Sequence, residues 1–316
     1  MSLYIVTIIL GVLLLTGGGE LLIRGALAAA KRLGVSPLLS GLIIVGFGTS
    51  APELAVSVDA AINGQPDIAV GNVVGSNIGN ILLILGICAL ISPMNVKPLV
   101  LRRDGVMMII ATVLCMILIG GQGLVRLDAA LLLAALLAYL IWAYVTERDE
   151  TVPSAEVHKA ESEAVTAIPV SMLWTVASVI LGLALLVVGS RVFLYGAIGI
   201  AESIGISEAV IGLTLVAVGT SLPELSISVL AAIRRQADVA IGNVLGSNIF
   251  NALGILGVSA LLQPLPVPER ILHIDQWVML GSALLVLVFL YTGKRLTRWE
   301  GLALILGYGV YVFSAL

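Results

Sequence analysis

Two nearly identical clusters of oxygen-bearing side chains interrupt apolar stretches of this sequence. They are the runs Gly48-Thr49-Ser50-Ala51-Pro52-Glu53-Leu54 and Gly219-Thr220-Ser221-Leu222-Pro223-Glu224-Leu225. On a helix, each glutamate shares a face with the serine three residues before it and the threonine four residues before it. A charge inside an apolar segment is costly and is usually functional. Glu53 and Glu224 are therefore the first candidates for a binding site.

Proline interrupts the helical hydrogen bonding in both runs. Pro52 and Pro223 have no N–H to donate, and each ring pushes on the carbonyl group one turn earlier. We therefore expect free carbonyl oxygens around 48–49 and 219–220. In hydrocarbon, a free carbonyl is tolerated only where a cation or water binds it. The break would place bare carbonyl oxygens beside the two carboxylates.

A second polar motif follows each run in the next apolar segment, where residues 71–80 repeat as 242–251. It supplies a serine and an asparagine four residues apart in each copy: Ser76 with Asn80, and Ser247 with Asn251. These side chains could also bond between helices without binding an ion. Neither motif contains Cys or His. Oxygen and amide groups suit hard cations such as Ca²⁺ or Na⁺ and argue against zinc or copper.

Two carboxylates at one site would control which ions occupy it. At about 4 Å apart they repel each other by roughly 4 kcal/mol at an effective dielectric constant of about 20. An empty site should therefore take up protons or cations. One divalent ion cancels both charges, and several monovalent ions do the same. Competition between the two classes of ion is expected.

The composition identifies the surroundings of these motifs as a membrane. Of 316 residues, 59% are hydrophobic and only 11% are charged, and the mean hydropathy is +1.14. A soluble protein carries about a quarter charged residues, so the composition argues against a globular enzyme. The net charge of -3 offers no basic patch for nucleic acid. Cys88 and Cys115 lie in apolar runs, so no disulfide is expected, and we expect no cofactor.

Ten apolar stretches are long enough to cross a bilayer as helices, which takes roughly 20 residues each. They lie near residues 3–23, 37–62, 68–91, 105–121, 127–146, 168–190, 208–233, 239–262, 274–291 and 299–315. Near the first of them, Glu20 precedes Arg24 by four residues, which predicts an ion pair on one helix.

The basic residues predict the orientation of these spans. If the N-terminus lies outside, the outer loops hold only Arg126, Arg191 and Arg270. The inner loops then hold Arg24, Lys31, Arg32, Lys97, Arg102, Arg103, Arg148, Lys159, Arg234, Arg235, Lys294, Arg295 and Arg298. By the positive-inside rule, both termini are expected to be extracytoplasmic.

The sequence also repeats itself with a shift of 171 residues. Residues 36–91 align with 207–262 without a gap, and 32 of the 56 positions are identical. Five spans separate the copies, and this odd number means that the second copy enters the membrane from the opposite side. We therefore predict an all-α membrane protein with ten transmembrane helices, arranged as two inverted five-helix repeats around a midplane site. The repeats would be residues 1–146 and 168–316, joined by an acidic cytoplasmic linker at 147–167.

Both motifs together closely resemble the α-repeats of the calcium/cation antiporter superfamily, especially its sodium/calcium exchanger branch. The resemblance rests on Gly-Thr-Ser-x-Pro-Glu followed about twenty residues later by Gly-Asn-x-x-Gly-Ser-Asn-Ile, present twice in a ten-span chain. It implies that Ca²⁺ is held by the side chains of Glu53 and Glu224 and by the backbone carbonyls of Thr49 and Thr220. It also implies Na⁺ sites that share the glutamates and add further oxygens: Ser50, Ser76, Ser221, Ser247 and the carbonyls near Gly46 and Ala217.

One position departs from the family pattern. Asn80 matches it, but Asn251 stands where many exchangers carry an aspartate, so this site has two formal charges rather than three. The departure bears on ion stoichiometry and on dependence on potassium. The resemblance further implies that the spans near 3–23 and 168–190 slide across the other eight to alternate access.

The sequence thus predicts a secondary antiporter, not an enzyme, that exports Ca²⁺ against an inward flow of Na⁺ at a prokaryotic inner membrane. Ca²⁺/H⁺ exchange by the same glutamates is the main alternative. A potassium-dependent exchanger is less favoured because those members tend to need the acidic residue that Asn251 replaces. A passive cation channel would need no counter-ion, and a structural membrane protein would tolerate Glu53→Gln and Glu224→Gln.

Overall fold

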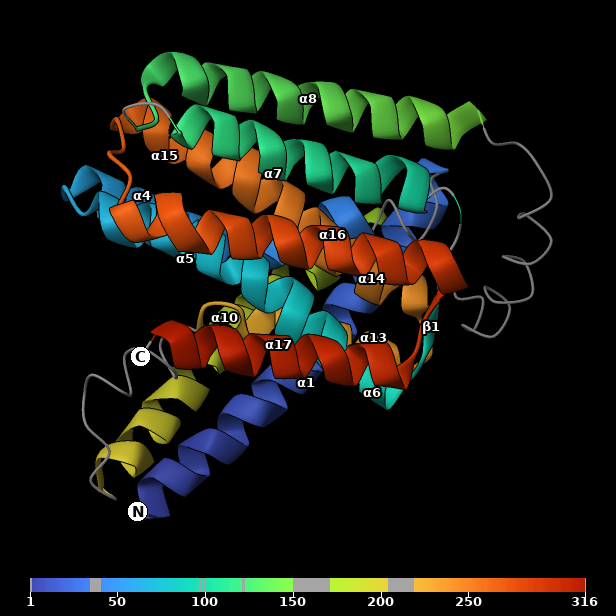
Figure 1. The fold of residues 1–316 in the computed structure, drawn as a ribbon. Coiled ribbons are helices and arrows are strands. Elements are labelled where there is room, and N and C mark those ends of the chain that lie inside the picture. The colour runs from blue at the N-terminus through green and yellow to red at the C-terminus, as the bar shows by residue number, and fades with distance from the viewer. Residues whose placement is uncertain are drawn as a thin grey trace.

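The computed structural model describes residues 2–34, 41–96, 98, 100–120, 123–149, 171–203 and 219–315, and most of these residues are helical (Figure 1). The first half contains α1 (Ser2–Leu33), η1 (Gly41–Gly46), α3 (Phe47–Thr49), α4 (Ala51–Ile62), α5 (Pro66–Gly79), η2 (Asn80–Leu85), α6 (Gly86–Ile91), β1 (Met94–Asn95), η3 (Val100–Gly105), α7 (Val106–Ile119) and α8 (Arg126–Asp149), where η marks a π-helical turn. The second half contains α10 (Met172–Ser203), α13 (Leu222–Ile233), α14 (Ala237–Ile249), η5 (Phe250–Ile255), α15 (Leu256–Leu262), η6 (Ile271–Asp275), α16 (Gln276–Gly293), β2 (Arg295–Leu296) and α17 (Arg298–Ala315).

Six described helical stretches are long and apolar enough to cross a membrane: Ser2–Leu33, Pro66–Ile91, Arg126–Thr146, Met172–Ile200, Ala237–Leu262 and Ile271–Gly293. A seventh span results if Ile43–Thr49 and Ala51–Ile62, which meet at a bend of 43°, are taken together. The ten-span count and the inverted arrangement therefore remain predictions.

Helices α1 and α10 are longer than the sequence indicated. They continue to Leu33 and Ser203, beyond the expected ends at 23 and 190. Apolar length marks only the part of a helix that lies in lipid. Beyond residue 23, good helix formers such as Ala28, Ala29 and Lys31 favour continuation of α1.

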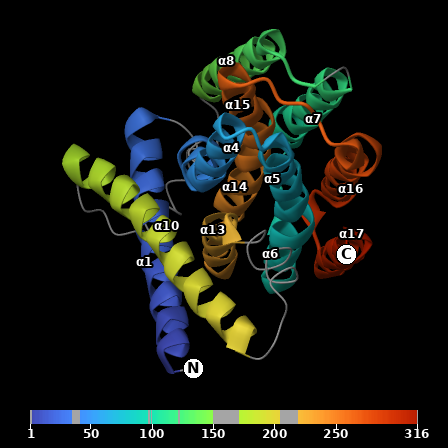
Figure 2. The same cartoon turned by 90° about the vertical axis from the view of Figure 1, so that its left-hand side faces the viewer.

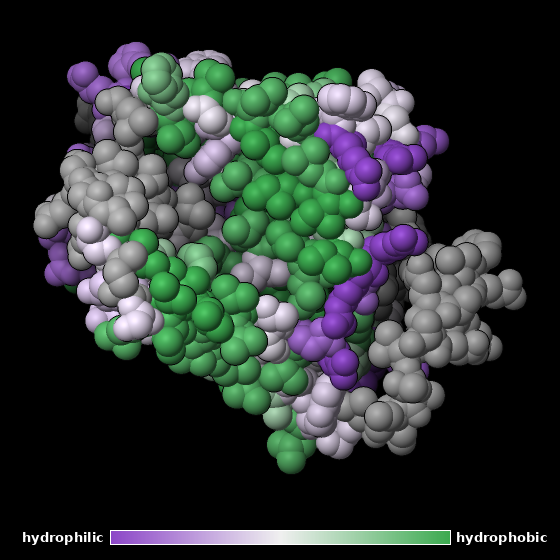
Figure 3. Space-filling view, turned by 90° about the horizontal axis from the view of Figure 1, so that it is seen from below, coloured by the Kyte–Doolittle hydropathy of each residue, from purple (hydrophilic) through white to green (hydrophobic). Residues whose placement is uncertain are grey.

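Two segments form the centre of the bundle. In Ala237–Leu262 and Pro66–Ile91, 83% and 67% of the most apolar window is buried, against 28% for α1, α8 and α10. The peripheral helices expose many large apolar side chains. Figure 3 shows one such face, covered largely by apolar residues, with hydrophilic residues gathered toward its ends. A surface of this kind is typical of a protein that lies in lipid.

Helices α1 and α10 cross each other beside the remaining helices (Figure 2). A glycine occurs every seven residues along both: Gly11, Gly18 and Gly25 on α1, and Gly182, Gly189 and Gly196 on α10. A side-chain carbon at Gly18 would come within 2.9 Å of the Gly182 carbonyl oxygen, and one at Gly182 within 2.7 Å of the Leu22 nitrogen. Only glycine allows two backbones to approach this closely, so the helices pack as one unit.

Two short backbone pairings tie the halves together. β1 pairs antiparallel with β2, with Met94 opposite Leu296. Leu124 pairs with Leu265 through N–H···O bonds of 2.9 and 3.0 Å. Each pairing joins two loops that the charge pattern places on one side of the membrane, inside for the first and outside for the second.

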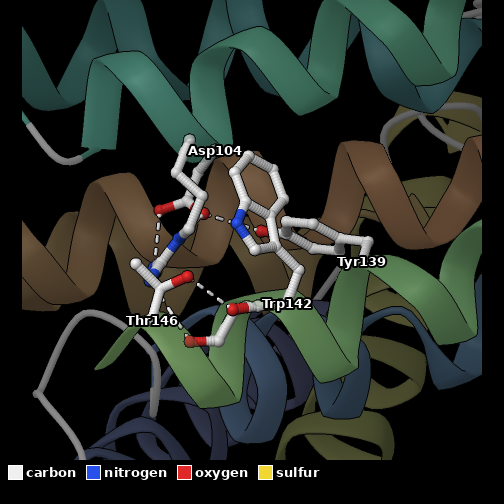
Figure 4. Close-up of polar contacts among 6 residues, drawn as sticks. Asp104, Tyr139, Trp142 and Thr146 are labelled. Atoms are coloured by element: carbon white, nitrogen blue, oxygen red, sulfur yellow. Dashed lines mark hydrogen bonds and ion pairs between the residues drawn. The ribbon is translucent and has the colours of Figure 1, made fainter. Parts of the chain in front are cut away.

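The structure corrects the sequence interpretation of Arg103, which the charge pattern assigned to an inner loop. Arg103 lies in η3, is 1% exposed, and donates two hydrogen bonds to Asp104, of 2.7 Å from Nε and 3.1 Å from Nη2. The Tyr139 hydroxyl of α8 donates to Asp104 Oδ1 at 2.8 Å, and Trp142 and Thr146 lie on the same helix (Figure 4). The charge of Arg103 is neutralised by its neighbour, so it adds little to the inner positive charge.

Candidate cation site

Both expected helix breaks are present. Ser50, between α3 and α4, has φ -79° and ψ 7°, and Ser221, before α13, has φ -86° and ψ 10°. In each case proline occupies the first turn of the following helix, where its missing N–H costs nothing. The break therefore directs Glu53 and Glu224, at the starts of α4 and α13, into the centre of the bundle.

The two glutamates are bound by serines of the opposite half. Both are 1% exposed. Ser221 Oγ donates to Glu53 Oε1 at 3.0 Å, and Ser50 Oγ donates to Glu224 Oε1 at 2.9 Å. The Oε2 atom of each glutamate is buried and has no hydrogen-bond partner among the described residues. A buried carboxylate oxygen without a donor is suited to bind a cation.

The threonines differ in how their hydroxyl groups are used. Thr49 Oγ1 lies 3.0 Å from the Val45 carbonyl oxygen and 3.1 Å from Asn243 Oδ1. This hydroxyl is therefore engaged, in agreement with a role for the Thr49 carbonyl rather than the side chain. Thr220 Oγ1 is buried without a partner in the described part of the chain.

Further oxygens lie around these groups. Ser76 Oγ lies 3.5 Å from Ser221 Oγ, and Ser247 Oγ donates to the Gly46 carbonyl at 3.0 Å. A side-chain carbon at Gly46 would come within 3.0 Å of the Ser247 nitrogen, so a larger residue would push the two backbones slightly apart. Ala217, the remaining expected contributor, lies outside the described residues.

Asn80 and Asn251 lie in the π-helical turns η2 and η5. Asn80 Nδ2 donates to Asn248 Oδ1 at 3.2 Å, and Asn80 Oδ1 is left without a partner. Asn251 is fully buried, and neither atom of its amide is bonded to a described residue. An unpaired buried amide is costly, and π-helical turns often occur at functional sites. Both asparagines are thus available to a bound ion or its water.

Two further asparagines of the second motif fix the glutamate backbones. Asn72 Nδ2 donates to the Glu53 carbonyl at 3.1 Å and to Ser57 Oγ at 2.9 Å. In the second copy, Asn243 Nδ2 donates to the Glu224 carbonyl at 3.1 Å and to Ser228 Oγ at 2.7 Å. Their occurrence in both copies was the signal for this role.

A contact between α10 and the second break was not among the sequence predictions. Ser190 Oγ donates to the Gly219 carbonyl at 2.8 Å, directly before Thr220. The residue at the equivalent position of α1 is Gly19, which has no side chain to donate. Because Ser190 is not repeated in the first half, comparison of the two halves gave no signal for it.

A small cavity opens beside two of the hydroxyl groups. Ser76, Ser221, Gly79 and Tyr308 are among its lining residues, and its volume of about 20 Å³ is enough for a single water molecule. The position equivalent to Gly79 in the second copy is Phe250, whose ring stacks on Phe47 at 4.5 Å between centroids. The two sides of the site are therefore filled differently.

The donor set suits a hard cation. Among the described residues, no group of three or more His, Cys, Asp or Glu side chains lies close enough to hold a metal. The site instead combines two carboxylates with hydroxyl, amide and carbonyl oxygens, which favours Ca²⁺ or Na⁺ over transition metals.

Comparison with known proteins places this site in a family context. A family model described as sodium/calcium exchanger protein matches residues 3–145 and 174–316. The putative antiporter CaxA of Alkalimonas amylolytica is 37% identical over 318 residues, covering 98% of each chain. The sodium/calcium exchanger MaX1 of Methanosarcina acetivorans is 34% identical over 336 residues, covering 96% of each. A solved structure of the sodium-calcium exchanger NCX_Mj, soaked with zero Na⁺ and Ca²⁺, matches with a TM-score of 0.84 at 31% identity, over 100% of this chain and 99% of that one.

Proposed function

Since this chain belongs to the sodium/calcium exchanger protein family, we propose that it is an antiporter that exchanges Na⁺ for Ca²⁺ at one site formed by Glu53 and Glu224. The observation that carries the proposal is the reciprocal pair of bonds, Ser221 to Glu53 and Ser50 to Glu224. Each half supplies a carboxylate and the hydroxyl that orients the carboxylate of the other half. Neither half forms this site alone.

Ion competition follows from the charge of the site. One Ca²⁺ neutralises both carboxylates and can be coordinated by the two free Oε2 atoms and the carbonyl oxygens of Thr49 and Thr220. Na⁺ ions neutralise the same charges one at a time, and the hydroxyl groups of Ser50, Ser76, Ser221 and Ser247 supply their further ligands. Since both ions need the glutamates, they bind in turn, which couples their movements.

Alternating access at this site would come from movement of α1 and α10 across the other helices. Their glycine-mediated contact supports movement as one body, and their low burial places them at the edge of the bundle. The family model matches the chain in two stretches, one on each side of residues 147–167, which supports two repeats of five helices. These stretches correspond to the proposed halves, residues 1–146 and 168–316, with the motifs at 36–91 and 207–262.

The protein is an integral membrane protein with prokaryotic relatives. We place it in an inner membrane with both termini outside, because this orientation puts most of the basic loop residues inside. The two backbone pairings agree with the span order, since each joins loops that the charge pattern assigns to the same side. Ca²⁺/H⁺ exchange is the weaker candidate, since the relatives named for their ions are sodium/calcium or sodium/potassium/calcium exchangers.

The experiment that tests this function is ⁴⁵Ca²⁺ uptake into proteoliposomes loaded in turn with Na⁺, K⁺ or protons. We expect uptake driven by an outward Na⁺ gradient and abolished by Glu53→Gln or Glu224→Gln. Glu269→Gln, an exposed carboxylate far from the site in sequence, is the matched control and should transport normally. Equal uptake with protons would move the protein to Ca²⁺/H⁺ exchange, and uptake without any counter-ion would contradict antiport.

A further inference from the structure

The contacts between the helix pair and the other helices are not symmetric. The shift of 171 residues gives each residue of the first repeat an equivalent in the second. Gly19 of α1 lies against Ile227 and Leu230 of α13, and Ile227 is fully buried. The equivalent of Ile227 on α4 is Val56, which is 38% exposed. The α1/α10 pair therefore covers α13 and leaves the equivalent face of α4 open.

An ion pair fixes this asymmetric position. Arg234, at the end of α13, donates from Nη1 to Glu20 Oε1 of α1 at 2.8 Å, and its Nη2 contacts Glu20 Oε2. The bidentate contact joins the helix pair to the rest of the bundle. Arg24 also bonds Glu20, as the sequence predicted, but it lies on α1 itself. Removing Arg234 would therefore weaken the contact of the helix pair with α13, whereas removing Arg24 would not.

The other side carries a second, unused pair of opposite charges, one of them one helical turn away from the equivalent position. The equivalent of Glu20 is Arg191 on α10, and that of Leu230 is Asp59 on α4. Both Arg191 and Asp59 are exposed, and neither side chain has an ion-pair partner in the part of the chain that the structure describes. In the observed pair the helix pair carries the acid, Glu20, and the bundle carries the base, Arg234. In the second pair the helix pair carries the base, Arg191, and the bundle carries the acid, Asp59.

The repeat relation predicts when this second pair would meet. If α10 lay over α4 as α1 now lies over α13, Ser190 would face Asp59 as Gly19 now faces Leu230. Arg191 would then lie beside Asn63, because Glu20 now lies beside Arg234 and these residues are equivalent. Asp59 is four residues before Asn63, so it is one turn away on the same face of α4 and within reach of Arg191.

We propose that Glu20–Arg234 and Arg191–Asp59 are alternative ion pairs, each formed in one of the two end states of the transporter and broken in the other. The inference rests on the proposed alternation of access. The Glu20–Arg234 pair forms at the predicted inner side, and the Arg191–Asp59 pair would form at the predicted outer side. Exposed ion pairs are weak, so they can bias the two states without trapping either one.

Cross-linking of two engineered cysteine pairs tests this alternation. One variant carries Glu20→Cys with Arg234→Cys, and the other carries Asp59→Cys with Arg191→Cys. The native thiols of Cys88 and Cys115 are fully buried and can remain. A short, membrane-permeant bis-methanethiosulfonate, which links two thiols through reducible disulfides, is applied to proteoliposomes in saturating Na⁺, in saturating Ca²⁺ and in neither ion. We expect the two cross-linking yields to change in opposite directions across these conditions, and either cross-link to stop transport until it is reduced.

Charge removal tests the ion pairs themselves. In the Asp59→Cys/Arg191→Cys background, Glu20→Gln should raise the cross-linking yield by about two- to fivefold, since it weakens the competing state. Arg24→Gln is the matched control and should leave the yield unchanged. In the Glu20→Cys/Arg234→Cys background, Arg191→Gln should likewise raise the yield.

Failure of this proposal can be told apart from failure of the proposed function. If residues 59 and 191 never cross-link while Na⁺-driven Ca²⁺ uptake proceeds, the alternative pair is wrong and the exchanger stands. If the two yields change reciprocally but Na⁺ does not drive Ca²⁺ uptake, the ion pairs alternate in a transporter of other ions.

Discussion

The cation site and the contact surface of the α1/α10 pair use the repeat in opposite ways. The contacts that orient the two glutamates have equivalents: Ser50 bonds Glu224 as Ser221 bonds Glu53, and Asn72 bonds the Glu53 backbone as Asn243 bonds that of Glu224. Among the described residues, the polar contacts between the helix pair and the rest of the bundle have no equivalent. Glu20 and Arg234 correspond to Arg191 and Asn63, and Ser190 corresponds to Gly19, so neither Glu20–Arg234 nor Ser190–Gly219 can be repeated by the equivalent residues.

The difference corresponds to two requirements of the proposed alternating access. A site that serves both sides of a membrane in turn benefits from equal groups on both sides. The moving element, in contrast, must occupy one position at a time, so its contacts in any single state are unequal. Symmetric chemistry and asymmetric packing are therefore expected in the same molecule.

The largest expected effect comes from breaking the symmetry of the site. Glu53→Gln or Glu224→Gln removes one of two buried charges and should lower Na⁺-driven ⁴⁵Ca²⁺ uptake by on the order of 100-fold, because the remaining charge no longer balances a divalent ion. Because the site is symmetric, both substitutions should have the same effect within a small factor. A Glu224→Gln variant that transports normally while Glu53→Gln is inactive would contradict the symmetric site.

Adding a charge to one half should change the electrical behaviour of transport. With two carboxylates, two Na⁺ balance one Ca²⁺, so wild-type exchange should move no net charge. Asn251→Asp adds a third carboxylate and should admit a third Na⁺. One moved charge corresponds to about 2.3 kcal/mol at 100 mV, or roughly 50-fold in the Ca²⁺ accumulation ratio.

The measurement is Ca²⁺ accumulation in proteoliposomes with a valinomycin-clamped potential. An inside-positive potential should favour accumulation by the Asn251→Asp variant and leave the wild type unchanged. Wild-type accumulation that follows the potential would show that the charge of the two glutamates does not set the exchange ratio.

Removal of one hydroxyl group should have a smaller effect that is again equal on both sides. Ser50→Ala and Ser221→Ala each leave one glutamate oxygen without its donor, which costs about 1.5–3 kcal/mol and should weaken apparent Ca²⁺ affinity by roughly tenfold. Ca²⁺ dependence of initial uptake rates measures the change. Ser314→Ala, which removes a hydroxyl that bonds the Tyr311 carbonyl within α17, should have wild-type affinity. Unequal losses at Ser50 and Ser221 would limit the symmetry to the glutamates.

The smallest expected effect concerns the helix pair. Gly18→Ala places a carbon 2.9 Å from the Gly182 carbonyl oxygen and should destabilise the protein by about 1–3 kcal/mol. At Gly17, no atom lies within 4 Å of the added carbon, so Gly17→Ala should be neutral or slightly stabilising. Thermal unfolding in detergent compares the two variants. Equal unfolding temperatures would show that α1 and α10 are not in backbone contact.

The sequence predicted the membrane class, the breaks at Ser50 and Ser221 and the candidate site residues, because polar groups in apolar helices are rare and therefore informative. It did not predict which serine binds which glutamate. Helical spacing placed Ser50 on the face of Glu53, but the break at Ser50 turns its hydroxyl toward Glu224. That partner is 174 residues away, and no local pattern contains it.

Other features depend on tertiary packing and were outside the reach of sequence patterns. The burial of Arg103 depends on Asp104 and on Tyr139 of another helix. The bond from Ser190 to Gly219 depends on where α10 lies against the second repeat. The sequence gives charges and periodicity, whereas these contacts follow from the arrangement of several helices.

The central claim, that the two glutamates form one shared site, is tested most directly by equilibrium ⁴⁵Ca²⁺ binding to the purified full-length protein. We predict one Ca²⁺ per chain, displaced by Na⁺, and loss of binding in both Glu53→Gln and Glu224→Gln while Glu269→Gln binds normally. Ca²⁺ binding that persists in either glutamate variant, or that Na⁺ does not displace, would contradict a single shared site.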